Sequence, residues 1–189
     1  MKGIIFTEFF ERVENVFSID VAEQMLELAN PASGGIYTSV GNYDHRELLL
    51  LVEQLSLITG VPECDLTMSF GEHLFFRFTQ MYPGMLTGKT SVFAFIESVE
   101  EVIHVHVRKL YPDAELPTIG TQRLDDGSLH VTYRSPRELG DIAHSMMSGC
   151  IKHFDEALAI ERMDLQDESG PFVHFRIYPV DVRVEACSK

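Results

Sequence analysis

The hydrophobic pattern of this chain changes its period at Pro117, and that change limits the folds open to it. Before Pro117, apolar residues recur every three or four positions, the spacing that places them on one face of an α-helix. After Pro117, short runs with turn residues between them are typical of β-strands. The sequence therefore predicts an α+β protein with a helical N-terminal part and a mixed C-terminal part.

Start and stop residues predict where the helices of the first part lie. Asp65 is expected to cap the fourth helix, Gly60 to end the third and Pro112 to end the fifth. The expected helices span residues 4–17, 21–28, 44–58, 65–81 and 90–111.

The second part begins with a hairpin signal. Asp125-Asp126-Gly127 lies between two strand candidates, residues 119–124 and 129–133. A helix is expected over 137–157, and two further strands over 159–165 and 171–179. Residues 181–189 are expected to form a C-terminal tail.

Length and composition indicate one domain. A chain of 189 residues with 45% hydrophobic content fills one core, so we expect a single domain over 1–180 with a helical subdomain over about 1–60 and a second over about 61–180. No run approaches the ~20 apolar residues of a membrane span, and the N-terminus has no secretory pattern. A cytoplasmic location is the expectation.

Charge and cysteine content exclude several kinds of partner. A formal net charge of -14 argues against nucleic acid and anionic membranes, which bind cationic surfaces. A basic partner protein, or none, fits better. The three cysteines form no C-x-x-C pair, so neither a disulfide framework nor a thiolate zinc site is indicated.

The run Tyr133-Arg134-Ser135-Pro136-Arg137 carries three hydrogen-bond donors at every second residue. In an extended segment these donors share a face, where two hydroxyls and a guanidinium suit a carboxylate or phosphate. The same run is also how an ordinary strand ends and a helix begins, since Pro136 and Glu138 form a helix start signal. The pentapeptide alone leaves both interpretations open.

Histidine supplies the next candidate chemistry, at His104-Val105-His106. On a helix the two imidazoles point roughly 200° apart, so only one serves a given pocket. Helical periodicity chooses His106, because it joins the apolar stripe of Phe95, Val99, Val102 and Leu110. No third ligand at clear spacing supports a bare zinc or non-heme iron site.

One helical imidazole, a carboxylate-binding cluster and an aromatic-rich N-terminal half together meet the needs of a heme. Two other classes stay open. An enzyme has little support, since no activated nucleophile, phosphate loop or paired carboxylates are visible. A heme-free interaction module remains the other alternative.

Four motifs carry a resemblance to a known family. They are Met1-Lys2-Gly3-Ile4-Ile5-Phe6, Phe70-Gly71-Glu72, His104 followed by Leu110-Tyr111-Pro112-Asp113-Ala114-Glu115-Leu116-Pro117, and Tyr133-x-Ser135-x-Arg137. In this order and spacing the chain resembles a stand-alone H-NOX domain, the heme nitric oxide/oxygen-binding family that includes the heme domain of soluble guanylate cyclase. The resemblance covers about residues 1–178.

The resemblance implies an H-NOX-like α+β fold with heme b lying between the two subdomains. It implies that His104 is the metal ligand, against the periodicity, and that Tyr133, Ser135 and Arg137 bind the heme propionates. It also implies that Pro117 presses on the porphyrin and bends it.

The resemblance further assigns the pocket in which a gas would bind. Oxygen-binding members carry a tyrosine that donates a hydrogen bond to dioxygen, and Ile142 stands at that position. Leu74 stands at the partner position on the earlier helix, with Phe78 one turn later, and Ile5 and Met146 are also expected to line the heme. Without a donor the expectation is nitric oxide selectivity; an oxygen-binding heme protein is the alternative.

The resemblance implies sensing without catalysis. Nitric oxide would bind ferrous heme, weaken the bond to His104 and change the subdomain orientation, which a separate histidine kinase or cyclic-di-nucleotide signalling enzyme would read. His73 and His144 are expected to point away from the heme. No structural zinc is expected, since Met163-Asp164-Leu165 stands where some relatives carry zinc ligands.

Overall fold

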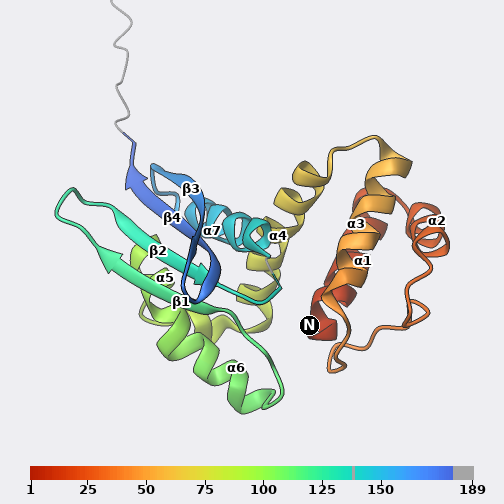
Figure 1. The fold of residues 1–189 in the computed structure, drawn as a ribbon, viewed down its shortest axis with the longest axis horizontal. Coiled ribbons are helices and arrows are strands. Elements are labelled where there is room, and N and C mark those ends of the chain that lie inside the picture. The colour runs from red at the N-terminus through yellow and green to blue at the C-terminus, as the bar shows by residue number, and fades with distance from the viewer. Residues whose placement is uncertain (138, 181–189) are drawn as a thin grey trace, which may run out of the picture.

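The computed structural model describes residues 1–137 and 139–180, so the predicted tail and Glu138 lie outside the described residues. The elements are α1 (Gly3–Val16), α2 (Ile19–Ala29), α3 (His45–Thr59), α4 (Glu63–Met81), the 3-10 turn η1 (Pro83–Leu86), α5 (Val92–Ser98), the π-helical turn η2 (Val99–His104), α6 (Val105–Leu110), β1 (Thr118–Arg123), β2 (Leu129–Arg134), α7 (Gly140–Phe154), β3 (Leu158–Asp167) and β4 (Gly170–Pro179). Figure 1 shows α1, α2 and α3 grouped on one side and the sheet on the other. The predicted α+β class is confirmed.

The first three helices and the first half of α4 share one hydrophobic core. Phe6, Met25 and Leu51 are completely buried in it. Ser18 and Asp44 cap α2 and α3 by accepting backbone N–H bonds, and Gly60 ends α3 with a left-handed φ of 72°. The helical spacing of apolar residues therefore led to the correct elements in this part.

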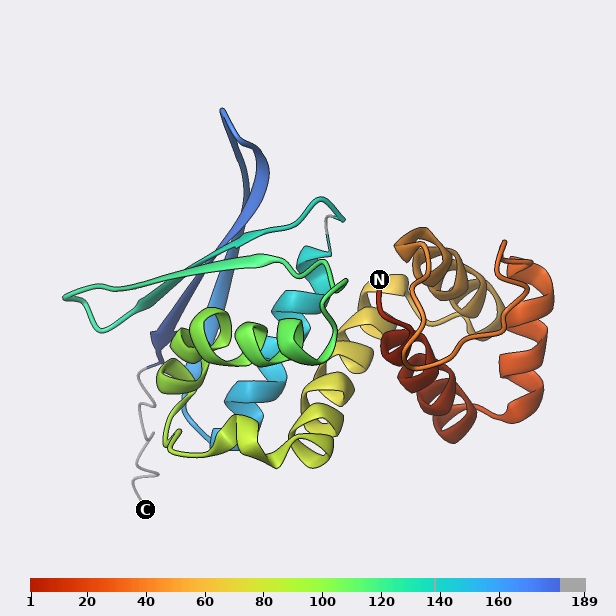
Figure 2. The same cartoon turned by 90° about the horizontal axis from the view of Figure 1, so that it is seen from below.

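The C-terminal part contains an antiparallel four-stranded sheet in the order β1-β2-β4-β3. The β1–β2 hairpin turns at Gly127, whose φ is 79°, as the Asp-Asp-Gly signal predicted. Leu129, Val131 and Tyr133 are buried and alternate with half-buried neighbours, so β2 has one core face. Figure 2 shows α5, α6 and α7 covering that side of the sheet.

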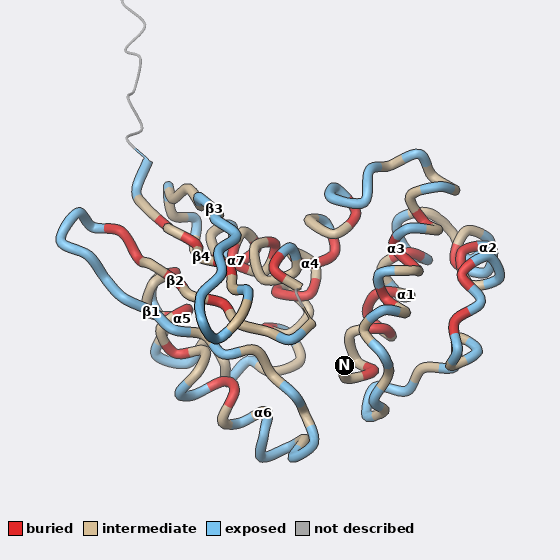
Figure 3. Tube along the Cα trace, in the orientation of Figure 1, coloured by how far each residue is buried: buried red, intermediate tan, exposed pale blue. Residues whose placement is uncertain are grey.

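Helix α4 belongs to both cores. Phe70 and Leu74 are buried in the N-terminal core, whereas Phe75 belongs to the core beneath the sheet. Gly71 lets α4 approach α7 closely, because a Cβ there would lie 2.2 Å from Cβ of Ser145. Figure 3 shows the buried residues of α4 in the middle of the molecule, between the two parts.

Three predicted boundaries were wrong, each for a local reason. Helix α4 begins at Glu63 and not at an Asp65 cap, because the carbonyl of Pro62 accepts the first backbone N–H bonds. Helix α7 begins at Gly140 and not at Arg137, since the amide of Arg137 donates to the Ser135 hydroxyl in a turn. Its end is Phe154, because the next residue adopts a left-handed φ of 53°.

The predicted helix over residues 90–111 is interrupted. It divides into α5, the π-helical turn η2 and α6, and it ends before Tyr111. Among the described residues, none of the helices combines the length and the apolar character that crossing a membrane requires.

Candidate heme site

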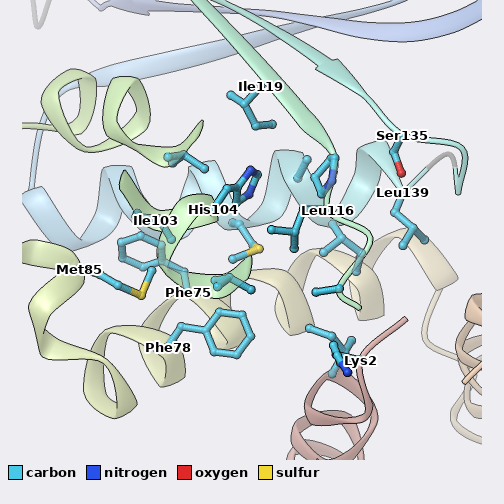
Figure 4. Close-up of a pocket in the computed structure, with 18 of the residues that line it drawn as sticks. Lys2, Phe75, Phe78, Met85, Ile103, His104, Leu116, Ile119, Ser135 and Leu139 are labelled. Carbon is cyan, nitrogen blue, oxygen red and sulfur yellow. The ribbon is translucent and has the colours of Figure 1, made fainter. Parts of the chain in front are cut away.

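A cavity of about 640 Å³ lies between the N-terminal helices and the sheet part. Its wall combines the start of α1, the end of α4, the α5–η2–α6 segment, the loop after α6, strand β2 and helix α7. Most of the lining side chains are apolar, among them Phe75, Phe78 and Ile103. Figure 4 shows His104 in the middle of these side chains, with Lys2 approaching from the start of α1. Such a cavity suits a large apolar ligand.

His104 is the buried imidazole of this wall. It is 8% exposed, and its Nδ1 lies 2.9 Å from Oε2 of Glu100. Burial lowers the pKa of His104, and the hydrogen bond to Glu100 opposes that shift. A neutral imidazole that donates from Nδ1 keeps the Nε2 lone pair for a metal. Nε2 has no hydrogen bond to any other residue in the described ranges.

His106, which periodicity favoured, is exposed at the rim of the cavity. Its Nδ1 lies 2.6 Å from the backbone oxygen of Val102, so this ring is tied to its own helix. The π-helical turn η2 causes the difference, because its wider turn rotates all later side chains relative to a regular α-helix. Val102 is consequently 42% exposed and Leu110 63% exposed, although both belonged to the predicted stripe.

The three donors of the pentapeptide converge on one end of the cavity. Tyr133, Ser135 and Arg137 all line it, although β2 ends at Arg134 and only Tyr133 lies within the strand. Tyr133 is 6% exposed, and burial raises the pKa of its hydroxyl. The guanidinium of Arg137 donates to the backbone oxygen of Glu115 at 2.6 Å and pairs with the Glu115 carboxylate. Two hydroxyls and a half-buried cation thus line the same end of the cavity.

The structure brings most of the predicted site residues together. Beside His104 and the three donors, the cavity is lined by Ile5, Phe78, Pro117, Ile142 and Met146. Leu74 is the exception, because its side chain is fully buried in the N-terminal core and is not among the residues that line the cavity. The phase of α4 turns Leu74 toward α1 and α3, one residue away from the lining residue Phe75.

Sequence reasoning missed several lining residues. They are Lys2, Tyr82, Val99, Ile103, Val107, Leu116 and Leu139. Lys2 is the polar one near the start of α1, and its Nζ lies 2.7 Å from Oδ1 of Asp113. Asn42 also donates to Asp113, so the loop after α6 is held against the N-terminal part. Lys2 and Asp113 both stand inside quoted motifs, but nothing in the residue types indicated that they would be in contact.

Burial raises the pKa of the Tyr82 hydroxyl and of the Tyr133 hydroxyl. His73 and His144 do not line the cavity. His73 Nε2 lies 3.7 Å from Oε2 of Glu8, and His144 packs on Phe175 with ring centroids 5.7 Å apart.

These residues fit a heme. The cavity is apolar, one buried imidazole presents an unshared nitrogen to it, and a cation with two hydroxyls stands where carboxylates would be bound. Fold and site therefore define the class of a heme-binding protein with its cavity between a helical and an α+β part.

The chain belongs to the H-NOX family. The family model described as haem-NO-binding matches residues 2–162. Members of this family are heme b-binding sensor domains and not catalysts. No curated protein sequence matches the chain.

Solved H-NOX structures are similar over nearly the whole chain. The Fe(II) unliganded protein from K. algicida is 36% identical, with 96% of this chain and 97% of that chain covered and a TM-score of 0.82. The protein from Shewanella woodyi, solved in the Fe(II)CO state with IWP-051 bound, is 35% identical, with 100% and 99% covered and a TM-score of 0.82. The S. oneidensis protein in the Fe(II)NO state is 26% identical, with 94% and 98% covered and a TM-score of 0.81.

Proposed function

We propose that this chain is a heme-based gas sensor that responds to nitric oxide in preference to dioxygen and signals to a separate protein. The observation that carries the proposal is the composition of the cavity wall on the N-terminal side. Ile5, Phe78 and Ile142 line the cavity and pack against the N-terminal core, and all three are apolar. Bound dioxygen carries partial negative charge and needs a donor for stability. Nitric oxide depends far less on one.

The residues on the other side hold the cofactor. Heme supplies, when bound, an iron that takes a diatomic gas as a ligand. His104 Nε2 is the group that would bind the iron, and Glu100 holds the ring from behind. Tyr133, Ser135 and Arg137 would bind the propionates, with Arg137 supplying the positive charge. Pro117 lines the same cavity and would press on the porphyrin.

A contact between the two parts of the chain offers a route for the signal. His104 is the last residue of η2, and α6 continues from it into the loop that contains Asp113. Asp113 binds Lys2 and Asn42 of the N-terminal part. A displacement of the His104 segment would therefore strain these contacts and shift the two parts relative to each other. A partner responds only if it binds the two arrangements with different affinity.

The proposed partner is a histidine kinase or a cyclic-di-nucleotide signalling enzyme in the cytoplasm. The formal net charge of -14 supports a partner with a basic docking surface and disfavours nucleic acid. In this proposal the chain itself performs no catalysis.

Titration with both gases tests the proposal. The reduced, purified protein should show a heme spectrum that changes on adding nitric oxide and stays unchanged in air before slow oxidation. A stable spectral change on exposure to dioxygen would instead identify an oxygen-binding protein. A colourless protein that cannot be reconstituted with heme would leave the heme-free interaction module. The His104→Gly variant should lose the axial ligand, whereas His106→Gly, which alters a rim residue, should keep it.

A further inference from the structure

The carboxylate of Glu100 joins three separate elements behind His104. Its Oε2 accepts from His104 Nδ1 at 2.9 Å and from the backbone amide of Ile119 at 3.1 Å. Its Oε1 accepts from Arg108 Nη2 at 3.0 Å. Glu100 and His104 stand in η2, Arg108 in α6 and Ile119 in β1. One side chain thus fixes the histidine to both the following helix and the sheet.

Three hydrogen-bond donors surround the carboxylate of Glu100. The guanidinium of Arg108, the ring of His104 and the amide of Ile119 all donate to it, which is the environment of a carboxylate anion. Its side chain is 29% exposed, so the charge is only partly screened by water. The partner of His104 is therefore an anion and not a neutral acceptor.

An anionic acceptor on one ring nitrogen changes the other. When Nδ1–H donates to a carboxylate, the ring orientation and tautomer are fixed and the electron density on Nε2 rises. A ligand richer in electrons favours the more positive oxidation state of the metal it binds. The strength of this effect depends on how much of the carboxylate charge is already neutralised by other donors.

We infer that Glu100 is a positioning residue for His104, because its hydrogen bond fixes the ring and raises the electron density at Nε2. Arg108 opposes this effect, since its positive charge neutralises part of the negative charge of the same carboxylate. This inference rests on the proposed role of His104 as the metal ligand. Glu100 touches neither the cavity ligand nor the gas; it acts through the histidine. The two residues should consequently shift the properties of the loaded protein in opposite directions.

Three heme-loaded variants test the inference. Glu100→Gln keeps the size and an acceptor but removes the charge, and Arg108→Met removes the competing cation. Glu97→Gln is the matched control, because Glu97 also carries a negative charge near this segment but pairs with Arg123 at 2.6 and 2.7 Å, away from His104. The measurements are the heme midpoint potential and the iron–histidine stretching frequency of the reduced protein.

In Glu100→Gln the ferric-to-ferrous ratio at a fixed potential should fall about tenfold, which for a one-electron couple is a rise of ~59 mV in midpoint potential. The iron–histidine frequency should fall with it. In Arg108→Met both quantities should move the opposite way. Glu97→Gln should leave the frequency unchanged and shift the potential by much less.

Equal shifts in Glu100→Gln and Glu97→Gln would overturn the inference, because they would show a general charge effect without the hydrogen bond. Shifts of the same sign in Glu100→Gln and Arg108→Met would overturn it as well, since they would indicate loss of structure. A wild-type protein that binds heme but shows no iron–histidine vibration would instead refute the assignment of His104, and the inference would fall with it. Should Glu100→Gln not fold, the sign of the Arg108→Met shift decides.

Discussion

Replacing Ile142 by tyrosine should give the protein a stable dioxygen complex, which the proposed selectivity does not allow the wild type. Ile142 stands in the first turn of α7, lines the cavity and packs against the N-terminal core. The close contact between α4 and α7 at Gly71 fixes the backbone here, since the carbonyl of Ile142 would lie 3.1 Å from a Cβ at Gly71. A larger side chain at residue 142 has no room toward α4 and should extend into the cavity that Ile142 lines.

The gain in dioxygen affinity follows from one new hydrogen bond, which the tyrosine hydroxyl would donate to the bound gas. A hydroxyl that donates to a charged acceptor contributes about 1.5–3 kcal/mol. The dissociation constant for dioxygen should then fall by roughly 10- to 150-fold, because each ~1.4 kcal/mol is tenfold. The pair of dissociation constants is obtained by equilibrium titration of the reduced wild-type and variant proteins.

Ile142→Phe is the matched control, since it adds the ring without the hydroxyl. It should bind dioxygen as poorly as the wild type and keep its response to nitric oxide. If Ile142→Phe gained as much dioxygen affinity as Ile142→Tyr, pocket size and not donor chemistry would control selectivity. A wild type that already binds dioxygen stably would refute the reasoning at its first step.

Three further predictions concern the stability of the fold and the proposed propionate-binding residue Arg137. Arg77→Met should lower the free energy of unfolding in urea by about 3 kcal/mol, because it leaves the carboxylate of Glu8, which is 5% exposed, without the partner 2.6 Å away; adding Glu8→Gln should restore most of the loss. Arg137→Ala should speed heme transfer to an excess of apomyoglobin roughly 10- to 100-fold, since one charge-assisted contact is lost. An unchanged rate would show that Tyr133 and its neighbours bind the propionates without Arg137. Hydrogen bonds from Ser128 lower the pKa of Asp126 to about 2. The ionised carboxylate therefore contributes to the free energy of unfolding above pH ~4, and this contribution is lost as the pH falls toward 2. The difference in the free energy of unfolding between wild type and Asp126→Asn should vanish over the same pH range.

Local sequence signals were sufficient for most of the fold. The helix stop at Gly60 and the hairpin turn at Gly127 mark real boundaries, because each acts through the conformation of its own few residues. The two helix starts placed wrongly, at Asp65 and Arg137, each depended on which of several nearby polar groups accepts a backbone N–H. That competition is decided by chain geometry, which residue types alone do not specify.

For the candidate site too, features that depend on a few neighbouring residues could be predicted from the sequence, and contacts between distant residues could not. The donor types of Tyr133, Ser135 and Arg137 and their spacing could be recognised in the sequence, although only Tyr133 lies within β2 and the other two line the cavity from the turn that follows. The contact of Lys2 with Asp113 could not be recognised, since it joins residues that are 111 positions apart and depends on how the two parts pack. Leu74 was expected in the cavity wall and lies in the N-terminal core for a related reason, because a helix that belongs to two cores has apolar residues on more than one side.

The choice between His104 and His106 depended on a signal that was present in the sequence but was read with the wrong period. Phe95, Val99, Ile103, Val107 and Tyr111 recur at every fourth position, and all five line the cavity. A regular α-helix advances ~100° per residue, so four such steps would carry the last side chain ~160° away from the first. One extra residue in a π-helical turn removes ~100° of that drift and keeps the row on one side. A strict four-residue repeat is therefore itself evidence for an under-wound turn. With that period, Ile103 is buried and Val107 half-buried, whereas Val102 and His106 are exposed at the rim of the cavity, and the imidazole that the turn leaves buried is His104.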